Sequence, residues 1–416
     1  MNRTTNMNGE PARRGPALVC TGLFLTIAAA HGLGACDLLM TSAPEPGDIF
    51  DGPLDRLSAA ELAAFAEGDA QFGLAFAPST GLGPIFNNVA CASCHSGDGR
   101  GRPENALTRF SRGSDPALEL GGPQLQDKAI PGAEVESVPA GVETSLRLPP
   151  PVFGIGLIEA IPEADILANA DPTDADGNGI SGRPHYVTPP DFLLEYGVSA
   201  SPTLGRFSRK AQVSSILEQT VRAYHQDIGI TTEFLPVENI NPLASSATAV
   251  ADRVPDPELA TSTVHSVVAY LRMLAPPAPG PMTARRTRGQ QVFQKVGCAS
   301  CHVPSFRTGP SSIRALAGRT VELHSDLLLH DMGDALADGR PDGQASGREW
   351  RTTPLWGLRI MREFLNGQAF LIHDGRARSV EEAILYHYGE ADSARMGFQT
   401  LSPEDRAALV DFVESR

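Results

Sequence analysis

The sequence is poor in cysteine, histidine and tryptophan, and it has fewer basic than acidic residues. Its 416 residues include six cysteines, ten histidines and two tryptophans. Lysine and arginine number 34 against 49 aspartates and glutamates, so the formal net charge is −15. This balance excludes nucleic acid as a partner, because binding to phosphates needs clustered basic side chains. The positions of the few cysteines and histidines therefore carry most of the functional information.

Four of the six cysteines lie in two copies of one pentapeptide, CASCH, at residues 91–95 and 298–302. Two thiols beside an imidazole are the attachment signature of c-type haem, in which sulfurs bind the vinyl groups and the imidazole binds iron. A redox-active cysteine pair or a zinc site is the alternative, but a closed zinc site needs four ligands and no other cysteine pair exists. We therefore predict two covalently bound haem c groups. They would be held by Cys91, Cys94 and His95 and by Cys298, Cys301 and His302.

The first 35 residues have the features of a lipoprotein export signal. Arginines precede the apolar run ALVCTGLFLTIAAA, and Leu33-Gly34-Ala35 stands directly before Cys36. The apolar run is too short to span a bilayer comfortably, and the cysteine stands where a lipid is attached. We expect removal of residues 1–35, acylation of Cys36 and a tether over residues 36–50. The protein would then lie on the periplasmic side of a bacterial membrane, held by its lipid anchor only. Simple secretion after cleavage at Ala35 is the alternative.

A proline-rich stretch divides the rest of the chain. Residues 275–281, APPAPGP, contain prolines that cannot continue a helix. About 380 residues is also long for one domain. We predict one haem domain over residues 51–275, a linker over 276–283 and a second haem domain over 284–416.

Each half begins and ends with a helical pattern. Gly68 with Phe72, and Gly289 with Phe293, stand before the two motifs, and amphipathic segments close the halves at residues 256–274 and 402–416. The arrangement resembles two cytochrome c folds in tandem, whose first and last helices meet at a small residue. We expect a mainly α protein with two cytochrome c-like domains and long loop insertions rich in glycine and proline.

A second repeated feature follows each motif. Residues 151–154 read PVFG and residues 354–357 read PLWG, and an arginine precedes each, Arg147 and Arg351. A guanidinium can bind a carboxylate through two parallel hydrogen bonds, so both arginines are candidates for binding haem propionates. Surface salt bridges are the alternative.

Four long segments carry a family resemblance. They read GLGPIFNNVACASCHSGDGRGRP, RLPPPVFGIGLIEAIPEADILANADPTDADGNGISGRP, SDLLLHDMGDALADG and FLIHDGRARSVEEAILYHYGEA. The sequence resembles the bacterial di-haem oxidoreductase family, relatives of the di-haem cytochrome c peroxidases, over most of residues 50–416. The resemblance implies two haems, one that takes up electrons and one that meets the oxidant. It does not fix the substrate.

The resemblance also points to a ligand for the second iron. In the peroxidases, the motif HDG is followed fourteen residues later by a methionine ligand; here HDG begins at His373, and His387 stands at that place. A capping box formed by Ser379 and Glu382 would begin the helix that carries His387. Two histidine ligands would give this haem a lower reduction potential than a His/Met pair. Met332 is the competing ligand, followed by His324 and His330, and a surface position for His387 is the other alternative.

The first haem departs from the peroxidases differently. No histidine lies between His95 and His185, so we expect an open sixth position at which peroxide binds. The resemblance points to Glu159 and Glu163 as candidates for catalytic proton transfer, against plain exposed carboxylates. The bridging tryptophan of the peroxidases is missing from this half, and Trp356 is a candidate for electron transfer or for the core.

An acidic segment between these regions resembles a calcium loop. Asp174, Asp176 and Asn178 occupy the first, third and fifth positions of an EF-hand pattern, but His185 stands at the twelfth, where a glutamate is expected. A calcium ion and a plain Asp/Gly turn are both open interpretations.

Three functions are compatible with these features. The first is a peroxidase that reduces hydrogen peroxide at the N-terminal haem, with electrons from a redox-protein donor relayed through the C-terminal haem. The second is a di-haem electron-transfer protein without peroxidase chemistry. The third is an oxidase of a protein or thiol partner.

Overall fold

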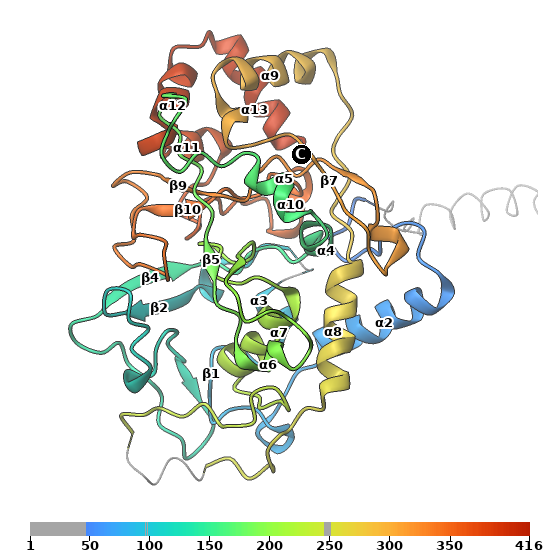
Figure 1. The fold of residues 1–416 in the computed structure, drawn as a ribbon, viewed down its shortest axis with the longest axis vertical. Coiled ribbons are helices and arrows are strands. Elements are labelled where there is room, and N and C mark those ends of the chain that lie inside the picture. The colour runs from blue at the N-terminus through green and yellow to red at the C-terminus, as the bar shows by residue number, and fades with distance from the viewer. Residues whose placement is uncertain (1–46, 96, 98, 245–250) are drawn as a thin grey trace, which may run out of the picture. The chain divides into compact units, whose positions relative to one another are not determined.

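The structure is a computed structural model that describes residues 47–95, 97, 99–244 and 251–416 (Figure 1). The predicted signal peptide, the predicted lipidation site Cys36 and most of the predicted tether lie outside the described residues. Within the described part, no helix has both the length and the apolar character needed to cross a membrane.

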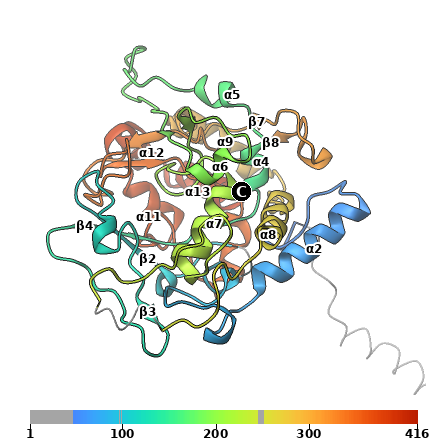
Figure 2. The same ribbon diagram turned by 60° about the horizontal axis from the view of Figure 1, so that its bottom comes forward.

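Two helix pairs organise the protein, one in each half of the sequence. Helix α2 (Ala59–Gly73) packs against α8 (Thr261–Met273), and the two lie side by side in both views (Figure 1, Figure 2). Helix α9 (Ala284–Lys295) packs in the same way against α13 (Pro403–Glu414). The first and last helices of each half are thus in contact, as predicted.

A glycine permits the close approach within each pair. A Cβ atom at Gly68 would lie 2.1 Å from the carbonyl oxygen of Ser266, and one at Gly289 would lie 2.0 Å from that of Ala408. Any side chain would force the backbones apart. Phe72 and Phe293, four residues after these glycines, are buried beside them.

The helices begin where the sequence carries capping signals. Ser58 and Glu61 form a reciprocal capping box before α2, with distances of 2.7 and 3.2 Å. The Ser402 hydroxyl accepts from the backbone N–H of Asp405 at the start of α13. These bonds satisfy backbone donors that have no partner within the helix.

The remaining helices are mostly short. They are α3 (Cys91–Cys94), α4 (Ile155–Glu159), α5 (Glu163–Leu167), α6 (Asp191–Leu194), α7 (Ile216–Ala223), α10 (Leu358–Phe364), α11 (Val380–Leu385) and α12 (Asp392–Gln399). A π turn, Tyr224–Ile228, continues α7.

Within the described residues, ten short strands pair into five antiparallel ladders. The pairs are β1 (Ile85–Phe86) with β3 (Lys128–Ala129), β2 (Leu107–Ser111) with β4 (Glu143–Arg147), β5 (Tyr186–Val187) with β6 (Thr203–Leu204), β7 (Phe306–Arg307) with β8 (Thr320–Val321), and β9 (Leu329–Asp331) with β10 (Glu349–Arg351). Arg147 and Arg351 are the last residues of β4 and β10.

The expectation of a mainly α protein is wrong. Helix accounts for 34% and strand for 12% of the structure, so the fold is mixed rather than all-helical. The cause lies in the composition, because 41 glycines and 34 prolines end helices after one or two turns. The long segments after the motifs therefore fold as loops and two-stranded ladders.

The largest apolar core draws on both halves of the sequence. It includes Phe65, Val264 and Tyr270 from the first helix pair together with Leu323 and Trp356 from beyond the proline-rich stretch. A second core surrounds α9 and α13. The division of the chain at residues 276–283 stays a prediction.

Candidate functional site

The described part of the structure has two cavities that are each lined by one CASCH segment. Cavity 1 is lined by Cys91, Cys94 and His95, and cavity 2 by Cys298, Cys301 and His302. Each has a volume of about 370 Å³, within the range of about 300–1,000 Å³ typical of cofactor sites. Both walls are largely aliphatic or aromatic, so either cavity suits a flat apolar group.

The two motif histidines are neutral imidazoles. Burial lowers the pKa of both His95 and His302 to about 4, although backbone carbonyls partly offset this effect. The Nδ1 of His302 donates to the carbonyl of His324 at 2.8 Å, which leaves Nε2 as the lone-pair nitrogen. A second hydrogen bond of this type is the usual way in which a protein orients an imidazole toward a metal.

One cysteine of each motif is buried in a way that disfavours its thiolate form. Burial raises the pKa of the Cys94 thiol to about 11 and that of Cys298 to about 12. None of the four described cysteines forms a disulfide. Because nucleophilic and metal-binding cysteines need a low pKa, the environment disfavours a redox pair or a zinc site.

His387 lies in cavity 2, as the family pattern predicts. It follows α11, whose first turn is capped by the hydroxyl of Ser379. Its Nδ1 donates to the carbonyl of Ala383 at 2.7 Å, so that Nε2 is again the nitrogen left for a metal. Cavity 2 therefore contains oriented imidazoles from two separate elements.

The other side chains considered near the second iron differ in whether they line cavity 2. Met332 and His373 also line cavity 2, whereas His324 is not among its lining residues. His373 stacks on Trp350, with ring centroids 3.7 Å apart. The choice of His387 as the ligand stays a prediction.

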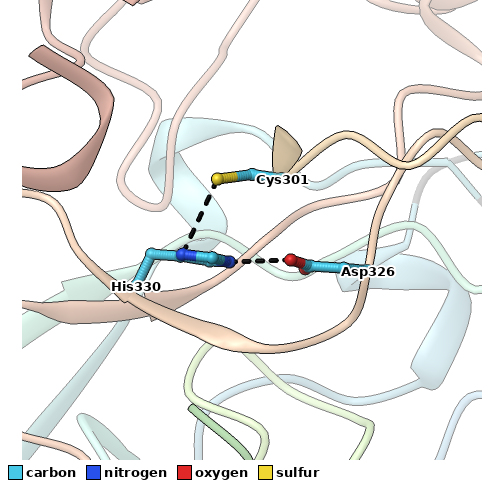
Figure 3. A group of neighbouring side chains, drawn as sticks. All are labelled: Cys301, Asp326 and His330. Atoms are coloured by element: carbon cyan, nitrogen blue, oxygen red, sulfur yellow. Dashed lines mark hydrogen bonds and ion pairs between the residues drawn. The ribbon is translucent and has the colours of Figure 1, made fainter. Parts of the chain in front are cut away.

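Figure 3 shows the His330 side chain between Cys301 and Asp326. Its Nε2 is 2.8 Å from an oxygen of Asp326, and its Nδ1 is 2.8 Å from an oxygen of Glu390. Burial opposes protonation, but these hydrogen bonds raise the pKa of His330 well above its usual value. With both ring nitrogens hydrogen-bonded to carboxylates, His330 has no free nitrogen for an iron.

Cavity 1 offers far fewer metal-binding groups. Among its described lining residues, His95 is the only histidine, and there is no methionine or lysine. Its charged lining consists of several arginines and one acid, Asp227. The face opposite His95 therefore has no evident second ligand for an iron.

The two glutamates predicted as catalytic lie outside the described lining of cavity 1. One oxygen of Glu159 pairs with Arg272 at 2.6 Å, and the other accepts from the N–H of Ile216 at the start of α7. Glu163 lies in the first turn of α5. Neither residue lines cavity 1, and their catalytic role stays a prediction.

The wall between the cavities contains buried cations without carboxylate partners. Four residues line both cavities: Arg209, Arg351, Thr353 and Pro354. Arg209 is 5% exposed and donates to the carbonyl of Leu148, and Arg351 is 8% exposed and donates to those of Ser208 and Thr352. A buried charge is costly unless it has a counter-ion. The two arginines of this wall could therefore bind anionic groups such as carboxylates.

Arg147 differs from these two arginines. It lines cavity 1, but its guanidinium is paired with Asp342 at 2.5 Å and Asp338 at 3.3 Å. Of the two arginines predicted from the sequence, Arg147 is thus paired with carboxylates, whereas Arg351 donates to backbone carbonyls. Arg209 was missed, because no motif or spacing marks that residue.

The two tryptophans lie at different cavities. Trp356 lines cavity 1, and Trp350 lines cavity 2 beneath the Lys210 ammonium, which is 4.5 Å from its ring centroid. Both belong to the second half of the sequence, so the second half supplies part of the wall of cavity 1.

The acidic loop gathers three carboxylates, one more than predicted. Oxygens of Asp171, Asp174 and Asp176 lie within 4.8 Å of one another. The oxygen of the Asn178 side chain accepts from the N–H of Ile180 instead. His185 is buried with its Nδ1 on the carbonyl of Lys210. The EF-hand pattern is thus only partly reproduced.

The residues around both cavities fit a haem group. Each cavity combines a neutral imidazole, two cysteines and apolar walls, and the shared wall offers cations that would match propionates. These features define a haem protein with two cofactor sites.

The comparisons with known proteins agree with this class. A family model described as "Di-haem oxidoreductase, putative peroxidase" matches residues 35–110 and 133–416. The chain belongs to this family, and it is therefore a haem-dependent oxidoreductase.

Other comparisons are more distant. Among solved structures, the chain is similar to hydrazine synthase from Kuenenia stuttgartiensis pressurised with xenon, at 14% identity and a TM-score of 0.38. That similarity covers 98% of this chain and 100% of the other. No curated protein matches the chain.

Proposed function

We propose that the protein is a di-haem peroxidase that reduces hydrogen peroxide at cavity 1, with electrons from a redox-protein donor relayed through cavity 2. The observation that carries this proposal is the difference between the cavities. Cavity 2 is lined by His302 and His387, whereas His95 is the only histidine among the described residues of cavity 1. One site is suited to storing an electron and the other to admitting an oxidant.

Each haem would be attached covalently by its CASCH segment. Thioether bonds would form at Cys91 and Cys94 in cavity 1 and at Cys298 and Cys301 in cavity 2. The high pKa values of Cys94 and Cys298 support a role in covalent attachment rather than thiolate chemistry. When bound, the haems supply redox-active iron, and the protein supplies its ligands and its surroundings.

The chain's own residues would orient the haems. His302 and His387 would hold one iron, and each imidazole is oriented by a hydrogen bond from its Nδ1. Arg209 and Arg351, which line both cavities, would bind propionates of both haems and bring the two groups to a common wall. Short separation through a shared wall favours electron exchange between them.

Three further features belong to the proposal. The chain is exported and anchored by a lipid at Cys36 on the periplasmic side. A calcium ion binds the acidic loop at Asp171, Asp174 and Asp176, whose mutual proximity supports it. The donor is a redox protein, and the acidic net charge of the chain would favour a basic one.

A peroxide experiment tests the proposal. The chain is produced in a host that attaches c-type haem, and denaturing mass spectrometry should show a gain of two haem groups. The reduced protein should then consume hydrogen peroxide in stopped-flow spectroscopy, at one haem before the other. An electron-transfer protein would keep both spectra unchanged, and a mass without haem would contradict covalent attachment.

A further inference from the structure

One acidic residue stands out among the charged residues of cavity 1. Six arginines line the cavity: Arg109, Arg147, Arg206, Arg209, Arg222 and Arg351. Among the described lining residues, Asp227 is the single carboxylate beside them. A group that moves a proton inside this cavity must be in it, and neither Glu159 nor Glu163 is.

Asp227 is held in place by the fold. It belongs to the π turn Tyr224–Ile228, and its backbone carbonyl accepts from the N–H groups of Asn87 and Asn88 at 2.8 and 2.9 Å. The Asn88 side chain in turn lies 3.4 Å from the sulfur of Cys94. Single π turns within helices often occur at functional sites. The carboxyl group is thereby fixed near the predicted attachment point of the haem.

The Asp227 side chain has one neutral partner of its own. An oxygen accepts from the Gln124 amide at 2.5 Å, and the same amide lies 3.0 Å from the oxygen of Asn87. No arginine of the cavity makes an ion pair with Asp227 among the described contacts. Burial raises the pKa of Asp227 to about 6, although the Gln124 hydrogen bond and the charge of Arg109 oppose the shift. The group can therefore change its protonation state near neutral pH.

We propose that Asp227 is the proton-transferring residue of the peroxide reaction in cavity 1. The inference rests on the proposed function, which it makes specific. Hydrogen peroxide takes up two electrons and two protons and forms two water molecules. The Asp227 carboxylate accepts a proton from one peroxide oxygen and delivers it to the other, so that the O–O bond breaks with water as the leaving group. This proton is moved within the peroxide, so both electrons of the overall reduction come from the redox-protein donor and both protons that it consumes come from solvent.

Cyanide binding provides a test without turnover. Hydrogen cyanide must lose a proton to bind ferric iron, so its association rate reports a base in the cavity. In the wild-type holoprotein this rate should rise as the pH increases through about 6, because Asp227 loses its proton there. In Asp227→Asn, both cyanide association and peroxide consumption should fall by about 100-fold, and the rise with pH should disappear. Asp227→Glu should restore most of both rates.

Asp127→Asn is the matched control. Asp127 is an exposed carboxylate that contacts the neighbouring Asn87 but does not line the cavity, so both rates should stay at the wild-type level. If wild type consumes peroxide while Asp227→Asn matches it in both rates, the inference is overturned and the proposed function stands. If wild type does not react with peroxide, the proposed function fails. A slower variant with an altered haem content or ferric spectrum would show a structural role and would also overturn the inference.

Discussion

The two cavities have similar volumes but differ in the number of histidine and methionine side chains that line them. Cavity 2 brings together His302, His387, Met332 and His373, whereas the described lining of cavity 1 has His95 as its only histidine, with Asp227 beside several arginines. The repeated CASCH segments thus supply the same attachment site twice, and the segments after them decide what each site does. The same motif thus stands in two different surroundings, one with several further histidine and methionine side chains and one without them among its described residues.

The largest expected effect comes from replacing His387, the proposed second iron ligand in cavity 2. His387→Gly should convert the haem of cavity 2 from low-spin to high-spin, because one axial ligand is lost. His387→Met should instead raise its reduction potential by a substantial part of the about 0.8 V range that axial ligands span. Electron paramagnetic resonance and redox titration measure the two outcomes.

Met332 provides the control for this experiment. Met332→Leu should leave the spin state and potential unchanged, since the proposed ligands of this iron are His302 and His387. If Met332→Leu gives the high-spin signal and His387→Gly does not, the ligand assignment is wrong.

The next largest effect concerns the buried ion cluster beside Cys301. His330→Gln should destabilise the protein by about 3–5 kcal/mol, because Asp326 and Glu390 lose their cation in a buried site. Denaturant unfolding of the holoprotein measures the change. The exposed His265→Gln should stay within about 0.5 kcal/mol of wild type, and an equal loss in both variants would contradict the role of the cluster.

The same cluster fixes a pH window for stability. The pKa of His330 is raised well above its usual value, so its contribution is complete below about pH 6.5 and is lost as the pH rises through the higher folded-state value. Hydrogen bonding to His330 and Ser181 outweighs burial and lowers the pKa of Glu390 to about 2, so its contribution is lost as the pH falls from about 4.5 toward 2. His330→Gln should flatten the alkaline limb of a stability–pH curve. An unchanged limb would contradict this assignment.

A smaller effect tests whether the cavities share a wall. Arg209→Gln removes a cation next to both sites and should lower both haem potentials. A unit charge about 8 Å away at an effective dielectric constant of 20 contributes about 2 kcal/mol, or about 0.1 V for one electron. Arg222→Gln, which lines cavity 1 only and is paired with Glu218, should lower one potential by less. If Arg209→Gln changes the reduction potential of one haem only, the claim that Arg209 stands beside both haem sites is contradicted.

The smallest expected effect is that of calcium. Chelation should lower the midpoint of thermal unfolding by a few degrees, corresponding to about 1 kcal/mol, because three carboxylates would then repel one another. Asp171→Asn should weaken calcium binding in isothermal titration calorimetry, whereas Asp165→Asn, an exposed acid outside the cluster, should not. Absence of any calcium binding by wild type would leave the loop as a plain acidic turn.

Features encoded locally were predictable from the sequence. The capping signals at Ser58 and Ser402 gave the starts of two helices, and Gly68 and Gly289 gave their close contacts. The CASCH segments indicated both cofactor sites before any geometry was known. In each of these cases, the residues that interact are a few positions apart or form a fixed motif.

Features that depend on long-range folding were missed. Arg209 and Asp227 carry no motif, and they reach the cavities only because distant segments meet there. Asp171 lies outside the EF-hand pattern and joins the acidic loop through the turn that precedes it. The strand content was also missed, since two- and three-residue ladders leave almost no periodic signal.

The spin states of the ferric holoprotein test the central claim most directly. Resonance Raman spectroscopy on protein with two haems should resolve one high-spin haem, assigned to cavity 1 by its loss on cyanide binding, and one low-spin haem in cavity 2. Two low-spin haems that do not change with cyanide would contradict the account.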